Sequence, residues 1–349
     1  MIDITKGKLV DLTHSFSSDT IYWPTESDGF QLETEFAGQT EKGYYYAQKK
    51  FAAPEHGGTH LDAPIHFFKD GDTVEQISLE KLVGSAIVID VSDKALDDSD
   101  YQVTVDDIVA WESEHGTIHE GSIVLVHTGY GQFWPDRQKY MGTEEIGEKG
   151  VGLLHFPGLH PDTARWLVEN RKINALGLDT CSVDYGQSKL FQTHRTLFEN
   201  NIIAFENVAN LDKLPPTGSH VIALPMKIEG GSGAPLRIIA TIPDEGENFD
   251  TETTAIGQDI KYPSGTPEIT SKIVTIPVGA ETGQHIHEIP MFSYMMEGQI
   301  TVDYGEQGTK TYVKGDSLVE AIHHTHNGKN TGDIPAKILV VLMDAEQNS

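Results

Sequence analysis

The kind of secondary structure that the sequence predicts changes once along the chain, near residue 243. Before that point, short runs rich in β-branched residues alternate with segments of helical periodicity, which favours an α/β domain. After it, predicted strands separated by glycine turns follow one another without a helix, as is typical of an all-β barrel or sandwich. We therefore predict an α/β domain over residues 1–243, a linker over 244–268 and an all-β domain over 269–349.

Local signals place the individual elements of both domains. A capping box variant at Thr104 should open a helix that runs to about Glu114, and Pro161 should lie in the first turn of a second helix. A third helix is expected over residues 193–199. The strands are expected at 44–51, 85–91, 122–127, 175–179, 202–206, 221–225 and 236–242, then at 272–278, 291–297, 299–304, 311–313, 317–321 and 336–343.

Charge and cysteine content narrow the classes of partner. The chain has 349 residues, with 53 acidic against 25 basic side chains and a net charge of -28. Such a surface repels phosphate backbones and anionic lipid, so we expect neither nucleic acid nor membrane partners. The single cysteine, Cys181, excludes an intrachain disulfide and fits a reducing compartment. No secretory signal and no apolar run of membrane-spanning length is seen, so we expect a cytoplasmic protein.

Residues 56–67 concentrate potential metal ligands. His56, His60, Asp62 and His66 fall within eleven residues, and imidazole and carboxylate are common ligands of zinc and similar divalent ions. Two glycines allow a tight turn, and a proline prevents a helix. A loop could therefore aim His56, His60 and Asp62 at one point and leave His66 free to carry protons. The alternative is a polar surface loop with unrelated histidines.

A second pair of residues could join this cluster. His194 lies on the third predicted helix, and Glu206 lies on the strand that follows it. A helix and the strand that it feeds can bring two such residues to one site. Taken alone, a histidine or a glutamate is usually solvated or hydrogen-bonded without a functional role.

The segment 56–67 matches the pattern His-x-Gly-Thr-His-x-Asp-x-Pro-x-His-Phe of the metal-dependent cyclase family, which includes kynurenine formamidase and isatin hydrolase. Residues 11–14, 23–24 and 178–184 also resemble segments of that family, and the likeness covers roughly residues 8–243. The resemblance implies a swivelling β/β/α fold and the hydrolysis of an amide, lactam or related carbon–nitrogen bond in a small metabolite, a class that includes aromatic ones. It also implies a homodimer or a higher homo-oligomer.

The resemblance further implies a role for each matching residue. His66 would be the general acid/base beside a water activated by the metal. Trp23, Phe67 and Phe68 could wall the substrate pocket, although ordinary core packing explains them equally well. The metal would be zinc or manganese, as one ion or two, held by His56, His60, Asp62, His194 and Glu206.

The second domain carries its own histidine pair, His285 and His287. With Gly279 and Gly298 they resemble the first cupin motif, Gly-x5-His-x-His-x3-Glu-x6-Gly, but Met291 stands where that motif has glutamate. The resemblance implies a double-stranded β-helix barrel. If both histidines lie on one strand, they point into the barrel together, where a later histidine could complete a further metal site. That later residue is His326, which matches the His-x3-Asn ending of the second motif.

Two other functions compete with hydrolysis at this point. The cupin could be the catalytic centre of an iron-dependent oxygenase, although the missing glutamate weighs against this interpretation. The chain could also be a non-catalytic protein that binds a metal or a metabolite. The presence of every expected ligand in the first domain favours a hydrolase.

Overall fold

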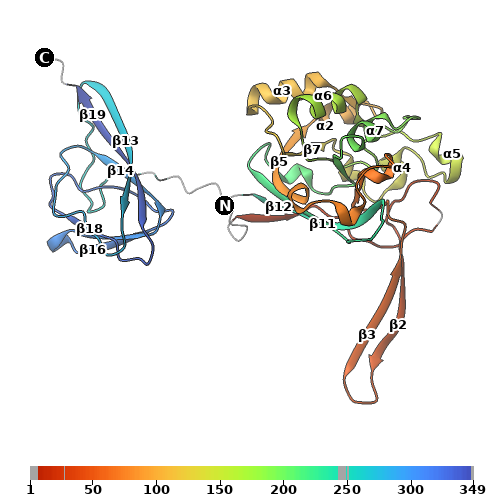
Figure 1. The fold of residues 1–349 in the computed structure, drawn as a ribbon, viewed down its shortest axis with the longest axis horizontal. Coiled ribbons are helices and arrows are strands. Elements are labelled where there is room, and N and C mark those ends of the chain that lie inside the picture. Colours follow the sequence, from red (N-terminus) through yellow and green to blue (C-terminus); the bar gives the residue numbers. More distant parts are fainter. Residues whose placement is uncertain (1–6, 27, 243–248, 250, 347–349) are drawn as a thin grey trace. The chain divides into compact units, whose positions relative to one another are not determined.

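The computed structural model describes residues 7–26, 28–242, 249 and 251–346 (Figure 1). The chain forms two compact units, Met1–Asp244 and Glu245–Ser349. The predicted linker, residues 244–268, falls partly outside the described residues, at 244–248 and 250. None of the helices in the described ranges combines the length and the apolar character that crossing a bilayer requires.

The first unit is built on an eight-stranded mixed sheet whose order is β1-β12-β11-β5-β7-β9-β10-β4. Its centre is parallel and contains β5 (Val83–Asp90), β7 (Ile123–His127), β9 (Ala175–Leu178) and β10 (Ile203–Glu206). The antiparallel strands are β1 (Lys8–Asp11), β4 (His60–Asp62), β11 (Ser219–Pro225) and β12 (Gly233–Ile242). Because β4 pairs with both β10 and β12, the sheet closes on itself.

Successive side chains along a strand point to opposite faces of the sheet, and each face carries its own apolar core. In β5, Ala86 and Val88 join the cluster that includes Leu125 and Phe205, while Ile87 and Ile89 join a different cluster on the opposite face. The main helices that cover this opposite face are α3 (Val105–His115), α6 (Pro161–Arg171) and α7 (Gln192–Phe198). These results confirm an α/β first domain.

The predicted helix starts are confirmed. Thr104 is the N-cap of α3 and forms a complete capping box with Asp107, and Pro161 occupies the first turn of α6. Such a cap contributes about 1 kcal/mol, because it satisfies backbone donors that the helix leaves unpaired. The sequence did not predict the remaining short elements, α1 (Leu79–Leu82), α2 (Ser92–Asp97), α4 (Arg137–Met141), α5 (Gly147–Val151), β6 (Gln102–Val103) and β8 (Gly158–Leu159).

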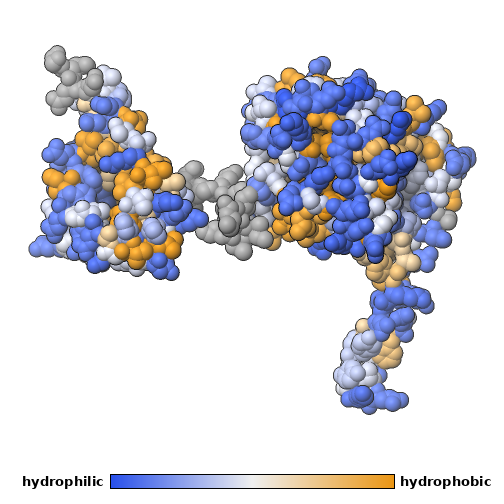
Figure 2. All heavy atoms as spheres, in the orientation of Figure 1, coloured by the Kyte–Doolittle hydropathy of each residue, from blue (hydrophilic) through white to orange (hydrophobic). Residues whose placement is uncertain are grey.

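A hairpin of β2 (Gln31–Gln39) and β3 (Tyr45–Ala52) extends away from the body of the first unit (Figure 1). Strand β3 was predicted, but its partner β2 was not. Every residue of β3 is exposed, and Figure 2 shows apolar and polar side chains side by side along the hairpin. β3 ends four residues before His56, so this arm leads directly into the histidine segment.

The second unit consists of two antiparallel sheets with an apolar core that includes Met295, Val302 and Ile338. One sheet contains β13 (Thr266–Ile276), β19 (Ala336–Glu346), β14 (Met291–Glu297) and β17 (Ser317–Val319). The other contains β16 (Thr309–Val313), β15 (Gln299–Asp303) and β18 (Asn327–Lys329). Apart from a 3-10 turn, η5 (Gly305–Gln307), the described part of this unit has no helix, which confirms the mostly β prediction.

Candidate metal centre

Two neighbouring strands bring three of the predicted site residues together. His60 and Asp62 are two residues apart in β4 and therefore share one face of it. The antiparallel register with β10 places Glu206 directly opposite His60. His60 Nε2 lies 3.1 Å from Asp62 Oδ1 and 3.5 Å from Glu206 Oε2. The exposed fractions of His60, Asp62 and Glu206 are 2%, 1% and 4%, so water screens none of these interactions strongly.

A glycine turn carries His56 into the same site. The backbone of Gly57 passes so close to Tyr22 that a Cβ atom on it would lie 2.1 Å from the tyrosine ring. Gly58 has a φ of +59°, in the left-handed region that glycine tolerates best. The turn places His56 Nδ1 2.6 Å from Asp62 Oδ1.

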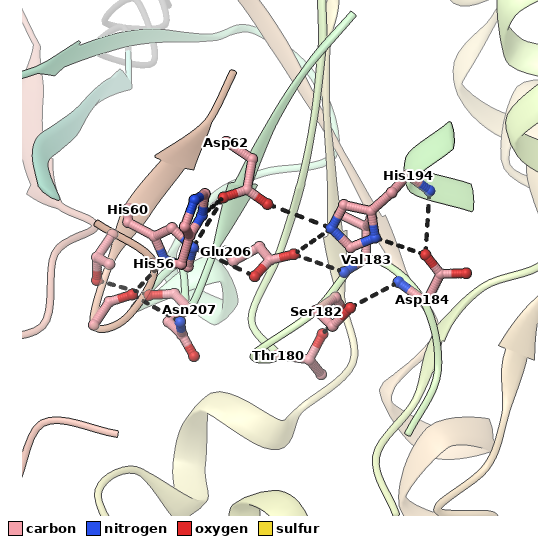
Figure 3. A network of polar contacts seen from close by, with 12 residues as sticks. His56, His60, Asp62, Thr180, Ser182, Val183, Asp184, His194, Glu206 and Asn207 are labelled. Atoms are coloured by element: carbon pink, nitrogen blue, oxygen red, sulfur yellow. Dashed lines mark hydrogen bonds and ion pairs between the residues drawn. The ribbon is translucent and has the colours of Figure 1, made fainter. Parts of the chain in front are cut away.

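His194 reaches the site from α7. Its Nε2 lies 3.1 Å from Glu206 Oε1 and 3.3 Å from Asp62 Oδ2, while its Nδ1 lies 2.6 Å from Asp184 Oδ2 (Figure 3). Asp184 also accepts hydrogen bonds from the backbone N–H groups of Thr193 and His194, in the first turn of α7. A single carboxylate therefore caps this helix and orients the imidazole that the helix carries.

His66 ends η1 (Pro64–His66) and lies beside the cluster. Its ring is stacked on that of His56, with the centroids 3.8 Å apart and an interplanar angle of 20°. Burial lowers the pKa of His66 to about 3. The side chain faces the cavity next to the cluster.

That cavity has a volume of about 210 Å³ and an aromatic wall. Trp23 and Phe67 line it, and Phe68 is not among its lining residues. Both Phe67 and Phe68 pack on the apolar cluster under the helices, so a pocket role for Phe68 stays a prediction. Phe191 completes the wall and was not predicted; its ring centroid lies 5.2 Å from that of Phe67 and 6.2 Å from that of Trp23.

Sequence reasoning also missed two polar residues that support the site. Asp184 lies in the segment 178–184, which resembles the cyclase family. That resemblance pointed to the segment but implied no role for Asp184. Ser232, whose Oγ lies 2.9 Å from His56 Nε2, directly precedes β12. The sequence offered no signal for Ser232, because its position depends on the pairing of β12 with β4.

The electrostatics of the site reflect buried carboxylates held among imidazoles. Burial opposes the charged form of Asp62, but His60 and His56 outweigh it and keep the pKa of Asp62 well below its usual range. Burial, and then the charge of Asp62, raise the pKa of Glu206. Burial by itself would lower the pKa of His60, but Asp62 and Glu206 together raise it to about 9.

The geometry at His60 shows what this site can hold. His60 Nδ1 donates to Gly58 O at 2.9 Å, so the lone pair is on Nε2 when the ring is neutral. This Nε2 is buried and has no hydrogen-bond partner among the described residues. A lone pair and two carboxylates that face one another in a buried site repel unless a cation lies between them. The donor set, imidazole nitrogen with carboxylate oxygen, fits a divalent metal ion.

Asp62 is shared between two groups of potential ligands. One group consists of His60, Asp62 and Glu206, and the other of His56, Asp62 and His66; within each group, the candidate atoms lie within 4.8 Å of one another. The structure thus brings the six residues predicted for this site to one place, with His194 in contact with both carboxylates. Which of them bind a metal stays a prediction.

A third group lies in the second unit, where candidate atoms of His285, His287 and His326 are within 4.8 Å of one another. His285 and His287 do not share a regular strand. They form isolated bridges instead, His285 with His326 and His287 with Ile322. Irregular backbone between β13 and β14 therefore carries both side chains to the site.

Comparisons with known proteins agree with this two-unit organisation. The family model described as "Putative cyclase" matches residues 10–185, and the model described as "Cupin domain" matches residues 272–342. The isatin hydrolase of Roseibium aggregatum is 34% identical over 234 residues, which cover 61% of this chain and 86% of that protein. The kynurenine formamidase of Salinibacter ruber is 28% identical over 244 residues, which cover 68% of this chain and 99% of that protein.

Solved structures show the same likeness. The structure of isatin hydrolase A from Labrenzia aggregata bound to benzyl benzoate has a TM-score of 0.61 and 34% identity, covering 68% of this chain and 94% of that chain. An isatin hydrolase bound to the product analogue thioisatinate also has a TM-score of 0.61, with 30% identity over 69% of this chain and 94% of that chain.

Proposed function

Because the chain belongs to the cyclase family, we propose that its first unit is a metal-dependent hydrolase of an amide, lactam or related carbon–nitrogen bond in a small aromatic metabolite. The observation that carries this proposal is the buried, unpartnered Nε2 of His60, which faces the carboxylates of Asp62 and Glu206. Relatives named isatin hydrolase and kynurenine formamidase support the bond class.

The proposed metal is zinc or manganese, as one ion or two. When bound, it would lower the pKa of a water molecule towards 7 and polarise a carbonyl group. The proposed ligands share imidazole or carboxylate chemistry and are His56, His60, Asp62, His194 and Glu206. Asp184 would hold His194 through Nδ1, so that Nε2 stays directed at the two carboxylates.

The proposed role of His66 is proton transfer. Hydrolysis adds water across the carbon–nitrogen bond: the carbonyl carbon gains an oxygen, and the departing nitrogen gains a proton. His66 faces the cavity and is held by stacking on His56, so it can move a proton between these two positions. A side chain stacked in this way keeps its position without any bond to the carboxylates of the site.

The walls of the cavity favour a flat substrate. Trp23, Phe67 and Phe191 surround the space next to the cluster, and aromatic rings pack well against planar groups. His60 and Asp62 also line this cavity, so the scissile carbonyl would be directed towards them while the ring packs against the aromatic side chains.

The closed sheet with helices on its outer face supports the swivelling β/β/α fold for the first unit, and the two sheets of the second unit support a double-stranded β-helix. We propose both assignments at this level of detail.

The test is hydrolysis by the full-length protein loaded with zinc or with manganese. We expect turnover of the lactam isatin and of a formylated aromatic amine, loss of turnover after chelation, and its return when the metal is restored. An aliphatic amide of similar size is the control for the aromatic walls. A fully loaded protein that turns over no member of an amide and lactam panel would contradict the proposal.

A further inference from the structure

The second unit contains a cavity that lies outside the proposed hydrolase site. Its volume is about 250 Å³, and its walls are mostly apolar, with Val274, Met295, Val302 and Ile338 among the lining residues. The imidazoles of the third group of potential ligands also line it. Polar groups in an apolar cavity lose their hydration, so each requires a partner that the cavity itself provides.

The imidazoles are set up to direct nitrogen lone pairs at the cavity. His285 Nδ1 donates to Gly283 O at 2.8 Å, and His326 Nδ1 donates to His324 O at 2.9 Å, so each neutral ring carries its lone pair on Nε2. His326 is only 3% exposed, and its Nε2 has no hydrogen-bond partner within the described ranges. The Nε2 of His287 is buried and equally without a partner there.

A buried carboxylate completes this arrangement. Glu320 directly follows β17 and is 6% exposed. Its Oε1 accepts hydrogen bonds from the hydroxyl of Tyr304 at 2.7 Å and from the backbone N–H of Ala321 at 2.9 Å. Its Oε2 lies 4.0 Å from the unpartnered Nε2 of His326. One oxygen is therefore anchored by the protein, while the other lies near the imidazole of His326 in the cavity that His285 and His287 also line.

The cupin motif has a glutamate at the position where this chain has Met291, so the carboxylate of that motif is missing here. Met291 itself lines the cavity. We propose that Glu320 supplies the missing carboxylate, so that His285, His287, His326 and Glu320 form a second divalent metal site. Its carboxylate comes from the end of β17 instead of from the start of β14.

Distances and charge support this assignment. Two ligand atoms that each lie about 2.1 Å from one ion are at most about 4.2 Å apart, and the separation between Glu320 and His326 meets this limit. The imidazole nitrogens, within 4.8 Å of one another, need only a small contraction. A buried carboxylate is costly unless a cation compensates it, and an ion held by neutral imidazoles would supply that charge.

Glu288 directly follows the motif residue His287, but it is not among the residues that line this cavity. It lines a different cavity, together with Pro290, His323 and Asp344. It therefore provides a matched control: an acidic residue near the motif histidines in sequence that does not reach the imidazoles of the proposed site.

The test is titration of the metal-free, full-length protein with Co²⁺, whose absorption spectrum reports its ligands. His326→Ala should remove one Co²⁺ equivalent per chain. Glu320→Gln should weaken that equivalent at least about 10-fold and change its visible spectrum, because it loses a directly bound carboxylate. Glu288→Gln should match the unmodified chain in both measurements.

Two outcomes would overturn the proposal. If His326→Ala binds as many equivalents as the unmodified chain, the cavity holds no metal. If Glu320→Gln keeps both the affinity and the spectrum, the imidazoles bind the ion without this carboxylate. Should Glu320→Gln fail to fold, Tyr304→Phe removes only the hydroxyl that anchors Glu320. A weakened affinity confined to the same equivalent would then support the site, and an unchanged affinity would contradict it.

Discussion

The two histidine clusters of this protein are built from different backbone and carry different charge. In the first unit, a regular strand pairing sets Glu206 opposite His60, and two carboxylates accompany the imidazoles. In the second unit, irregular segments carry His285 and His287, and Glu320, the one acidic residue among the described residues that line the cavity, lies near the imidazole of His326.

This difference predicts how each cluster treats a cation. Two carboxylates balance both charges of a divalent ion, and in the absence of metal they raise the pKa of His60, so protons compete for the same position. One carboxylate leaves part of the ionic charge uncompensated. The first cluster is therefore suited to tight binding, and the second depends more strongly on its single carboxylate.

Removing a metal ligand of the first cluster should have the largest effect. We expect His60→Ala to lose the first-unit metal and to reduce amide or lactam hydrolysis by more than about 10⁴-fold, because both water activation and carbonyl polarisation require the ion. Metal content per chain and steady-state rates measure this. The metal of the second unit should remain, and loss of metal from both units together would show that the two clusters are not independent.

Removing the proposed proton carrier should have a smaller effect. His66→Ala should reduce turnover by about 10²- to 10⁴-fold while the metal content stays unchanged, since His66 is proposed to move protons and not to hold the ion. His155→Ala, which changes an exposed histidine of the same unit, is the control and should keep full activity. Unchanged turnover in His66→Ala would exclude this role, and lost metal would make His66 a ligand.

The smallest of the three effects should come from the residue that orients His194. Asp184→Asn should weaken metal binding by the first unit about 10- to 100-fold, the range typical of residues that position a ligand. Asp184 accepts hydrogen bonds at α7 with both of its oxygens, and Asn has only one acceptor oxygen, so the free energy of unfolding should fall by about 1 kcal/mol. Competition with a chelator and thermal unfolding separate these effects. A stability loss without an affinity change would leave Asp184 a helix cap alone.

Much of the fold could be predicted from local signals in the sequence. Apolar β-branched runs predicted the parallel strands, and the capping box at Thr104 predicted the start of α3. The run of strands without a helix predicted that the second unit is mostly β. The hairpin partner β2 was missed because its residues are exposed on both faces, so no apolar alternation marks it. The short helices α4 and α5 were missed because five residues carry too little periodicity.

For the sites, the sequence by itself determined the local chemistry: the spacing of His56, His60, Asp62 and His66, and the histidines of the cupin motif. The family resemblances also named His194, Glu206 and His326, but only the tertiary structure showed how distant residues meet at each cluster and added Asp184 and Glu320. Glu206 meets His60 through the register of β10 with β4, Asp184 meets His194 at the start of α7, and Glu320 faces His326 across the cavity. Pairing between distant segments depends on packing of the whole unit, so residue spacing along the chain does not encode it.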